Sequence, residues 1–344
     1  MTHKERFYAT IERRPVDRPA CWLGIPTADA LPGLFQHFGV RTLAGLKRKL
    51  DDDIFPVELP YHSPTSDAIY MAFDFPKKGG KVADKDRALT APGFFEDYSD
   101  PARVDDFPWP DPTKYIDPAE CSKVVAAAPR DTAVLGVIWC AHFQDACAAF
   151  GMETALCKML AEPDMFLAVI DRITDFYLKA NEIFYSAAKG KLDAVLIGND
   201  FGSQTALMLS PGLIREHVWR GTRQLVDQAK RHNVRVIHHS CGAIRDIIPD
   251  LIDMGVDVIH PIQARATGME PASLAREFGK RVSFCGGVDV QELMVNGTPD
   301  QVRASVRELR RLFPTGLVIS PSHEALLPDV PPANVEALFQ AARE

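Results

Sequence analysis

Long apolar runs are missing from this sequence, and the residues after Met1 lack the apolar core of a secretory signal peptide. A transmembrane helix needs about 20 consecutive apolar residues, so we expect neither a spanning segment nor a leader. Positively charged residues are fewer than negatively charged ones: the chain has 39 Lys and Arg and 46 Asp and Glu, for a net charge of −7. This balance argues against nucleic acid or an anionic membrane as a partner. We therefore expect a cytoplasmic protein.

Two local signatures are absent as well. Seven cysteines, an odd number, are scattered through the chain without the tight spacing of a disulfide framework, which predicts reduced and mostly buried thiols. No G-x-G-x-x-G sequence follows an expected strand, so the phosphate-binding turn of an open dinucleotide-binding sheet is missing.

What the sequence does contain is a regular alternation of short apolar runs with amphipathic segments. The short runs predict strands, and apolar residues at helical spacing predict helices. Such alternation means parallel pairing, and eight units close most naturally as a (β/α)8 TIM barrel of the α/β class. The expected strands are 20–24, 51–59, 133–140, 194–198, 234–237, 256–259, 281–284 and 316–319, and the expected helices are 4–13, 29–38, 42–50, 147–161, 163–189, 211–231, 244–254, 271–278, 299–313 and 332–342.

Residues 72–118 interrupt this alternation. They are rich in Pro, Gly and charge, which predicts a polar hairpin and a Pro-rich crossing inserted after the second strand. The segment has too few spaced apolar residues to build a core of its own. We therefore expect residues 1–344 to form a single barrel domain.

Polar and coordinating side chains follow most of the expected strands. In a parallel barrel the carboxyl ends of the strands meet at one rim, where catalytic residues gather. Ordinary structural roles remain open: Asp200 could cap a turn, and Cys285 could be a small core residue. The residues concerned are His142, Gln144, Asn199, Asp200, Gln204, His239, Cys241, His260, Gln263, Cys285, Asp289, His323 and Glu324.

The most informative of these positions are His239 and Cys241, at the end of the fifth expected strand. Residues i and i+2 of an extended chain point the same way, so this imidazole and thiol share a face while His238 points to the other. Imidazole and thiolate are good zinc ligands. The pair makes a site only with a third ligand, and His323 follows the eighth expected strand at a similar depth.

Five segments of the chain resemble the uroporphyrinogen decarboxylase superfamily, and the resemblance covers nearly the whole length. The resemblance implies a (β/α)8 barrel. It also implies a group that contains true decarboxylases and zinc-dependent methyltransferases acting with corrinoid proteins and thiols such as coenzyme M, and it suggests a homodimer. The segments are Arg13-Arg-Pro-Val-Asp-Arg-Pro19, Asp200-Phe-Gly-Ser-Gln204, His239-Ser-Cys-Gly242, Phe284-Cys-Gly-Gly-Val-Asp289 and Ser320-Pro-Ser-His-Glu324.

Two comparisons within this resemblance separate its branches. The decarboxylases carry Arg-Gln-Ala-Gly-Arg after the first strand, whereas Trp22-Leu-Gly-Ile-Pro-Thr-Ala28 has no arginine, so a porphyrinogen would lack partners for its carboxylates. The methyltransferases carry His-x-Cys after strand five, which His239-Ser-Cys241 matches. They carry a further Cys after strand eight, where this chain has His323, so His323 would replace that ligand.

The sequence therefore predicts a methyltransferase that moves a methyl group between a small methylated substrate or thiol and a corrinoid held by a partner protein. Zn²⁺ would be its cofactor. The residue roles that follow are metal binding by His239, Cys241 and His323, catalysis by Asp200 and Glu324, and substrate binding by Gln204, His142 and Asn199.

Two alternatives remain open at this point. One is a metal-free decarboxylase or lyase acting on a non-porphyrin substrate, with Asp200 and His142 as its acid and base. The other is a binding protein that has kept the barrel and lost its chemistry, since one fold hosts many functions.

Overall fold

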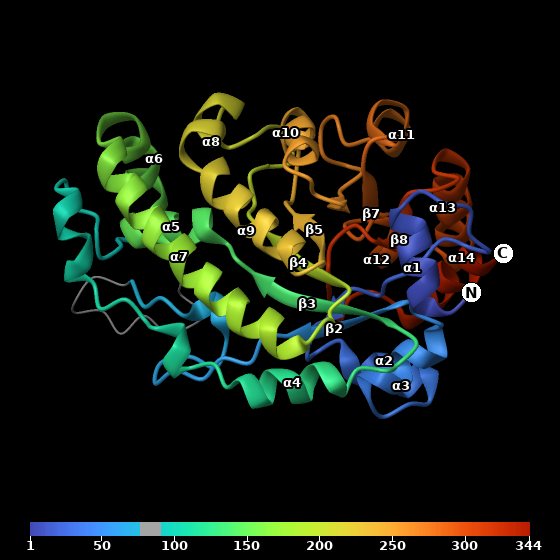
Figure 1. The fold of residues 1–344 in the computed structure, drawn as a ribbon. Helices are drawn as coiled ribbons and strands as arrows, with labels where there is room; N and C mark the ends of the chain where they lie inside the picture. The colour runs from blue at the N-terminus through green and yellow to red at the C-terminus, as the bar shows by residue number, and fades with distance from the viewer. Residues whose placement is uncertain (76–90) are drawn as a thin grey trace.

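The computed structural model describes residues 1–75 and 91–344. Its main sheet has seven strands, each paired in parallel with the next along the chain. Helices cover the outside of the curved sheet (Figure 1), which confirms an α/β fold built on parallel strands. The strands are β2 (Ile54–Glu58), β3 (Ala133–Trp139), β4 (Ala194–Gly198), β5 (Arg235–His239), β6 (Val258–Ile262), β7 (Ser283–Val288) and β8 (Leu317–Pro321).

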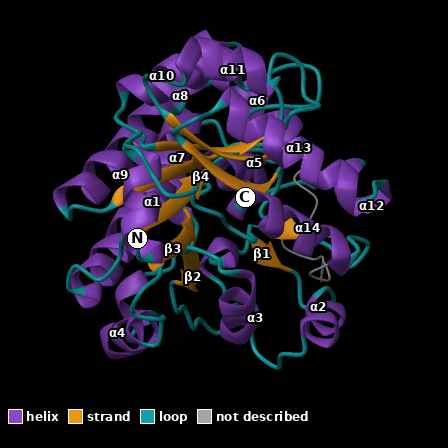
Figure 2. Cartoon of the chain, turned by 90° about the vertical axis from the view of Figure 1, so that its right-hand side faces the viewer, coloured by secondary structure: helices purple, strands orange, loops and turns teal. Residues whose placement is uncertain are grey.

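The helices lie around the central strands (Figure 2). Several begin where proline and a capping side chain predict a start: Ser210 accepts the amide of Leu213, and Thr298 forms a capping box with Gln301. None in the described ranges is long and apolar enough to cross a membrane. The helices are α1 (His3–Ile11), α2 (Leu31–Phe38), α3 (Leu43–Leu50), α4 (Pro118–Ala126), α5 (His142–Phe150), α6 (Met152–Ala161), α7 (Pro163–Ala188), α8 (Pro211–His217), α9 (Trp219–Arg231), α10 (Ile248–Asp253), α11 (Pro271–Phe278), α12 (Leu293–Asn296), α13 (Pro299–Leu312) and α14 (Pro332–Arg343).

Two expected helices are divided in the structure. The helix expected at 147–161 begins earlier, at His142, and breaks at Gly151, whose φ of 86° ends α5 and starts α6. A Cβ at Gly151 would meet the carbonyl of Ala91 at 3.0 Å, so the break also makes room for the chain that crosses it. The helix expected at 211–231 breaks at Val218 into α8 and α9.

The prediction of a strand at 20–24 was wrong. Cys21 forms only an isolated parallel bridge to Ile319 of β8, and its carbonyl accepts the amide of Asp53 beside β2. The carboxylates of Asp53 and Asp52 accept the amides of Cys21 and Leu23 at 2.8 and 3.0 Å. Because these side chains occupy the donors that a ladder would use, the segment touches both edges of the sheet without becoming a strand.

A short second sheet follows this segment. It pairs β1 (Ile25–Pro26) in parallel with β9 (Ala325–Leu326), just beyond β8. The two loops that the sequence analysis singled out, after the first and eighth expected strands, are therefore hydrogen-bonded to each other.

The core has two parts. A small inner cluster is formed by alternate residues of the strands and by Phe7 and Ile11 of α1, and includes Leu135, Leu196 and Val318. A larger cluster fills the space between the sheet and the helices. Alternation between an inner and an outer layer is the packing expected of a strongly curved parallel sheet.

The described part of the 72–118 segment is richer in buried aromatic side chains than expected. The expected hairpin falls mostly on residues 76–90, outside the described ranges. The remainder contains the 3-10 turns Pro101–Asp106 and Pro112–Lys114 and the start of α4. Phe73 packs edge-on against Phe176 of α7 with ring centroids 4.8 Å apart, and it belongs to the same buried cluster as the outer core.

Candidate active site at the carboxyl ends of the strands

Asp200, His239 and Cys241 form a compact group at the ends of β4 and β5. The Nε2 atom of His239 lies 3.4 Å from Cys241 Sγ and 3.2 Å from Asp200 Oδ1. The backbone N–H of Cys241 also donates to Asp200 Oδ1, at 2.9 Å. One ligand atom from each of the three residues lies within 4.8 Å of the others.

The close approach of β4 and β5 depends on Gly198. Gly198 pairs with His239 across the ladder, and a Cβ on Gly198 would lie 2.0 Å from the carbonyl oxygen of His239. A side chain there would push the strand ends apart. The glycine therefore permits Asp200, two residues further on, to reach the His239 ring.

Charge organises this group. Burial alone would raise the pKa of Asp200, but hydrogen bonds from the His239 ring and the Cys241 amide, with the imidazolium charge, lower that pKa to about 2. Burial also disfavours a charged His239, yet Glu324 and Asp200 raise the pKa of His239 well above its usual value. These two carboxylates therefore favour the imidazolium form of His239.

A second group shares the His239 ring. His239 Nδ1 lies 3.0 Å from His260 Nδ1 and 3.4 Å from Glu324 Oε2, and these three residues also have ligand atoms within 4.8 Å of one another. Burial lowers the pKa of His260 well below its usual value, so His260 accepts the proton that the charged His239 donates. His260 Nε2 is buried without a partner.

His260 was expected at a strand end but without a role in the site. The missing signal was register, because His260 is the residue opposite His239 in the β5–β6 ladder. Two histidines at paired positions of neighbouring parallel strands must lie side by side. That pairing follows only once the strand bounds are known to within one residue.

His323 lies beside this group rather than at its centre. Its Nδ1 accepts the amide of Ala325 at 3.0 Å, and an interaction with the Cys241 thiol raises the pKa of His323. The rings of His239 and His323 are perpendicular, with centroids 6.2 Å apart. His239, Cys241 and His323 are thus neighbours, but Asp200 takes the third place in the tighter group.

A cavity of about 530 Å³ opens beside these residues. Trp139 enters its wall from the end of β3, where Trp139 and Cys140 have left-handed φ values of 65° and 54°. Such conformations cost about 1–3 kcal/mol each and cluster at functional sites. The lining residues are Ile25, Pro26, Thr27, Glu58, Tyr70, Trp139, Ala141, Gln144, Asp145, Gly198, Asp200, His239, His323, Glu324 and Ala325.

Two further polar groups of α5 line this cavity. Asp145 Oδ2 accepts a hydrogen bond of 2.7 Å from the hydroxyl of Tyr177, and burial raises the pKa of Asp145 to about 7 although that bond opposes the rise. Gln144 Oε1 is buried without a hydrogen-bond partner. Gln144 was among the polar residues expected at this rim, whereas Asp145 was not, because no helix was expected before residue 147.

The residues expected to bind substrate lie outside the cavity wall. His142 is buried, with Nδ1 3.0 Å from the carbonyl of Cys140, and Asn199 accepts the amide of Phe143 at 2.8 Å. His142 and Asn199 also contact each other at 3.3 Å, so they brace the ends of β3 and β4. Gln204 is exposed on the loop after β4.

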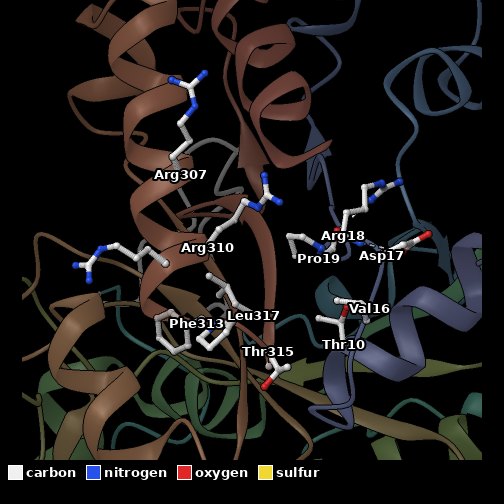
Figure 3. Close-up of a pocket in the computed structure, with 13 residues that line it drawn as sticks. Thr10, Val16, Asp17, Arg18, Pro19, Arg307, Arg310, Phe313, Thr315 and Leu317 are labelled. Carbon is white, nitrogen blue, oxygen red and sulfur yellow. Dashed lines mark hydrogen bonds between the residues drawn. The ribbon is translucent and has the colours of Figure 1, made fainter. Parts of the chain in front are cut away.

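A second hollow, of about 310 Å³, lies at the opposite end of the sheet beside the start of β8 (Figure 3). Its lining includes Arg307 of α13 with Arg18 and Asp17, and it contains neither histidine nor cysteine. Arg307 is paired with Glu344, and Arg18 with Asp53. Of these two hollows, only the carboxyl-end cavity is lined by histidines, and one of them, His239, contacts Cys241.

The donor set at that cavity suits a zinc ion. Two ligand atoms on a tetrahedral zinc ion lie about 3.4–3.6 Å apart for the usual bond lengths. The His239–Cys241 and His239–Asp200 separations of 3.4 and 3.2 Å are close to these values. Imidazole, thiolate and carboxylate are the ligand types that zinc accepts, so the residues present fit the ion.

The comparisons with known proteins agree on one family. The family model described as "Uroporphyrinogen decarboxylase (URO-D)" matches residues 79–344. A uroporphyrinogen decarboxylase from Acidiphilium cryptum is 28% identical over 229 residues, which are 64% of this chain and 60% of that protein. A methylated-thiol–coenzyme M methyltransferase from Methanosarcina mazei is 28% identical over 159 residues, 46% of this chain and 40% of that protein.

These matches span between two fifths and three fifths of the curated relatives' lengths. Among solved structures, a methyltransferase from Methanosarcina mazei superposes with a TM-score of 0.70 at 18% identity, covering 99% of this chain and 98% of that one. The likeness establishes a shared fold over the full length.

Proposed function

We propose that this chain, which belongs to the uroporphyrinogen decarboxylase family, is a zinc-dependent methyltransferase. It would move a methyl group between a small methylated substrate or thiol and a corrinoid carried by a partner protein. The observation that carries the proposal is the His239–Cys241 pair, in which the imidazole lines the cavity and the thiol lies 3.4 Å from its Nε2 atom. The methyltransferases among its relatives and structural neighbours support the reaction class.

The ion would be held by His239 and Cys241, with Asp200 or His323 as the third ligand. When bound, zinc would act as a Lewis acid and would lower the pKa of a coordinated thiol. Asp200 would also fix the loop that carries Cys241, since it accepts the Cys241 amide. Glu324, 3.4 Å from His239 Nδ1, would orient the imidazole that faces the ion, as carboxylates do for metal-bound histidines.

The direct test is elemental analysis of the purified protein. We expect about one zinc per chain in the wild type and loss of that zinc in His239→Ala and Cys241→Ser. Asp200→Ala and His323→Ala then identify the third ligand, because only the coordinating residue should matter. His62→Ala, an exposed histidine paired with Asp67 and Glu120, is the matched control. Full zinc content in both His239→Ala and Cys241→Ser would refute the proposal.

The reaction itself is tested with free reduced cobalamin as the methyl acceptor. The zinc-loaded protein should convert it to the methylated form when a suitable methyl donor is added, and Cys241→Ser should not. The change in the visible absorption spectrum measures the rate.

A decarboxylase is the second candidate, favoured by the match to the Acidiphilium protein. Two features weigh against it. Within residues 1–75 and 91–344, the cavity lining includes no Lys or Arg to pair with the carboxylates of a porphyrinogen, and His142, the expected base, is hydrogen-bonded behind the wall. Release of carbon dioxide at an undiminished rate in the presence of a chelator would favour this alternative over the methyltransferase.

A further inference from the structure

Carboxylates outnumber the other charged groups on the wall of the active-site cavity, so its charge is mainly negative. The carboxylates are Glu58, Asp145, Asp200 and Glu324, and none of the described residues that line the cavity is a Lys or Arg. Asp200 and Glu324 lie against His239. Glu58 and Asp145 have no such partner, and they come from other elements, the end of β2 and the first turn of α5. The part of the wall away from the metal group is therefore acidic in its own right.

A bound metal ion would not reverse this sign. A divalent ion held by one thiolate adds a single net positive charge, whereas the wall supplies the carboxylates of Glu58, Asp200 and Glu324 and, above its pKa of about 7, that of Asp145. A sulfonate or carboxylate on the substrate would face a negative field with no guanidinium or ammonium group among the described lining residues to pair with it. Desolvating such an anion without a partner costs several kcal/mol.

Aromatic side chains complete the same wall. Trp139 and Tyr70 both line the cavity, and Trp139 stands edge-on to the His239 ring with centroids 5.4 Å apart. Its left-handed backbone places it there at a conformational cost. Aromatic faces combined with carboxylates attract organic cations, and the attraction is greatest where water is excluded.

We propose that the cavity selects a small methylated organic cation, of the quaternary ammonium type, as the methyl donor. This inference rests on the proposed methyltransferase function and assigns its substrate class. Asp145 and Glu58 would supply the countercharge and Trp139 the aromatic face. The Tyr177 hydroxyl holds one oxygen of the Asp145 carboxyl, at 2.7 Å, which leaves the other oxygen available to the substrate.

The charge change during transfer agrees with this assignment. The C–N bond of the ammonium breaks and its electron pair stays on nitrogen, so the product is a neutral tertiary amine. The new bond to the methyl carbon uses the electron pair of the nucleophile, the reduced corrinoid of the proposed function. The neutral product is no longer attracted to the carboxylates, which favours its release.

The test compares choline with its neutral carbon isostere, 3,3-dimethylbutan-1-ol, by isothermal titration calorimetry on the zinc-loaded protein. The two have the same shape, so the difference in affinity measures the charge. We expect choline to bind roughly tenfold more tightly, which corresponds to about 1.4 kcal/mol. We also expect it to bind more tightly than the anion 2-hydroxyethanesulfonate, which has no thiol to coordinate the zinc. Equal binding of choline and the isostere, or tighter binding of the anion, would overturn the inference.

Variants locate the cation within the cavity. Glu58→Gln and Asp145→Asn should each weaken choline binding roughly fivefold and leave the isostere unaffected, because only the countercharge is lost. Glu58 is exposed, so its substitution does not endanger folding. Glu153→Gln on α6, outside the cavity, is the control and should change neither affinity. Unchanged choline binding in both cavity variants would contradict the assignment.

The outcomes distinguish failure of the cation site from failure of the proposed methyltransferase function. Choline binding without methyl transfer to reduced cobalamin would keep the cation site and refute the methyltransferase. Methyl transfer from neutral donors such as methylated thiols, with no quaternary ammonium accepted, would keep the methyltransferase and refute the cation site.

Discussion

At the scale of the residue, the site is organised around one imidazole with four polar neighbours. His239 Nε2 faces Asp200 and Cys241, and its Nδ1 faces Glu324 and His260. Each ring nitrogen therefore has a carboxylate and one further partner. Such a ring has little freedom to rotate, which is what a preorganised metal ligand requires.

Titration of Asp145 should make the affinity of the cavity for a cation depend on pH. Burial raises its pKa to about 7, so the carboxyl is neutral below that pH and negative above it, and an organic cation should bind more tightly as pH rises from 6 to 8. The neighbouring Tyr177, Cys140 and Cys147 stay neutral over this range, because burial raises their pKa values too. Calorimetric titration of choline at several pH values measures the effect.

Asp145→Asn is the control for this pH dependence. The rise in affinity between pH 6 and 8 should flatten in the variant, since the titrating carboxyl is gone. A rise of the same size in wild type and variant would assign the titration to another group.

At the scale of the element, carboxylates replace backbone bonds where the sheet closes. Asp53 has no exposed side-chain surface, and it accepts from Arg6 of α1 and from Arg18, both at 2.7 Å. Its other bonds reach the amide of Cys21 and the ring of His3. One carboxylate thus ties α1, the segment before β1 and the start of β2 together.

Asp53→Asn should be strongly destabilising, because it removes the buried negative charge that Arg6 and Arg18 share and leaves them only the partly exposed carboxylates of Asp17 and Asp51. Removal of one partner of a buried ion pair costs about 3–5 kcal/mol, read as a fall in the free energy of unfolding in urea. Arg14→Ala removes the exposed pair with Glu12 and should cost less than about 1 kcal/mol. Similar small losses in both variants would show that the buried pair is dispensable.

The contact between β4 and β5 gives a second test at this scale. Gly198→Ala places a methyl group 2.0 Å from the His239 carbonyl oxygen, so it should separate the strand ends, lower the free energy of unfolding by about 1–3 kcal/mol and reduce zinc content. Gly33→Ala in α2, where nothing lies within 4 Å, should instead stabilise by about 0.5–1 kcal/mol. Normal zinc content in Gly198→Ala would show that this close approach does not position the site.

At the scale of the whole molecule, periodicity and residue type were enough to predict the parallel α/β architecture and the position of His239 and Cys241. Parallel strands bring their carboxyl ends together whatever the details of the loops. We propose in addition that residues 1–344 form one domain, because Phe73 and Phe95 of the interrupting segment belong to the same buried cluster as the outer core.

The errors arise where tertiary contacts override the local pattern. The 20–24 strand is lost to carboxylates 29 to 32 residues away, which no local window contains. The place of His260 in the site follows only from the strand register. The place of Asp145 follows only from a helix that starts five residues earlier than its apolar spacing indicates. His142 and Asn199 follow strands as expected, yet their hydrogen bonds turn them toward the scaffold.

The central claim is that His239 and Cys241 grip one zinc ion, and X-ray absorption at the zinc edge of the purified protein tests it most directly. The account predicts one sulfur neighbour at about 2.3 Å and nitrogen or oxygen neighbours at about 2.0–2.1 Å, with the sulfur contribution absent in Cys241→Ser. A spectrum of the wild type with no sulfur neighbour, or with only the oxygen ligands of a loosely bound ion, would contradict it.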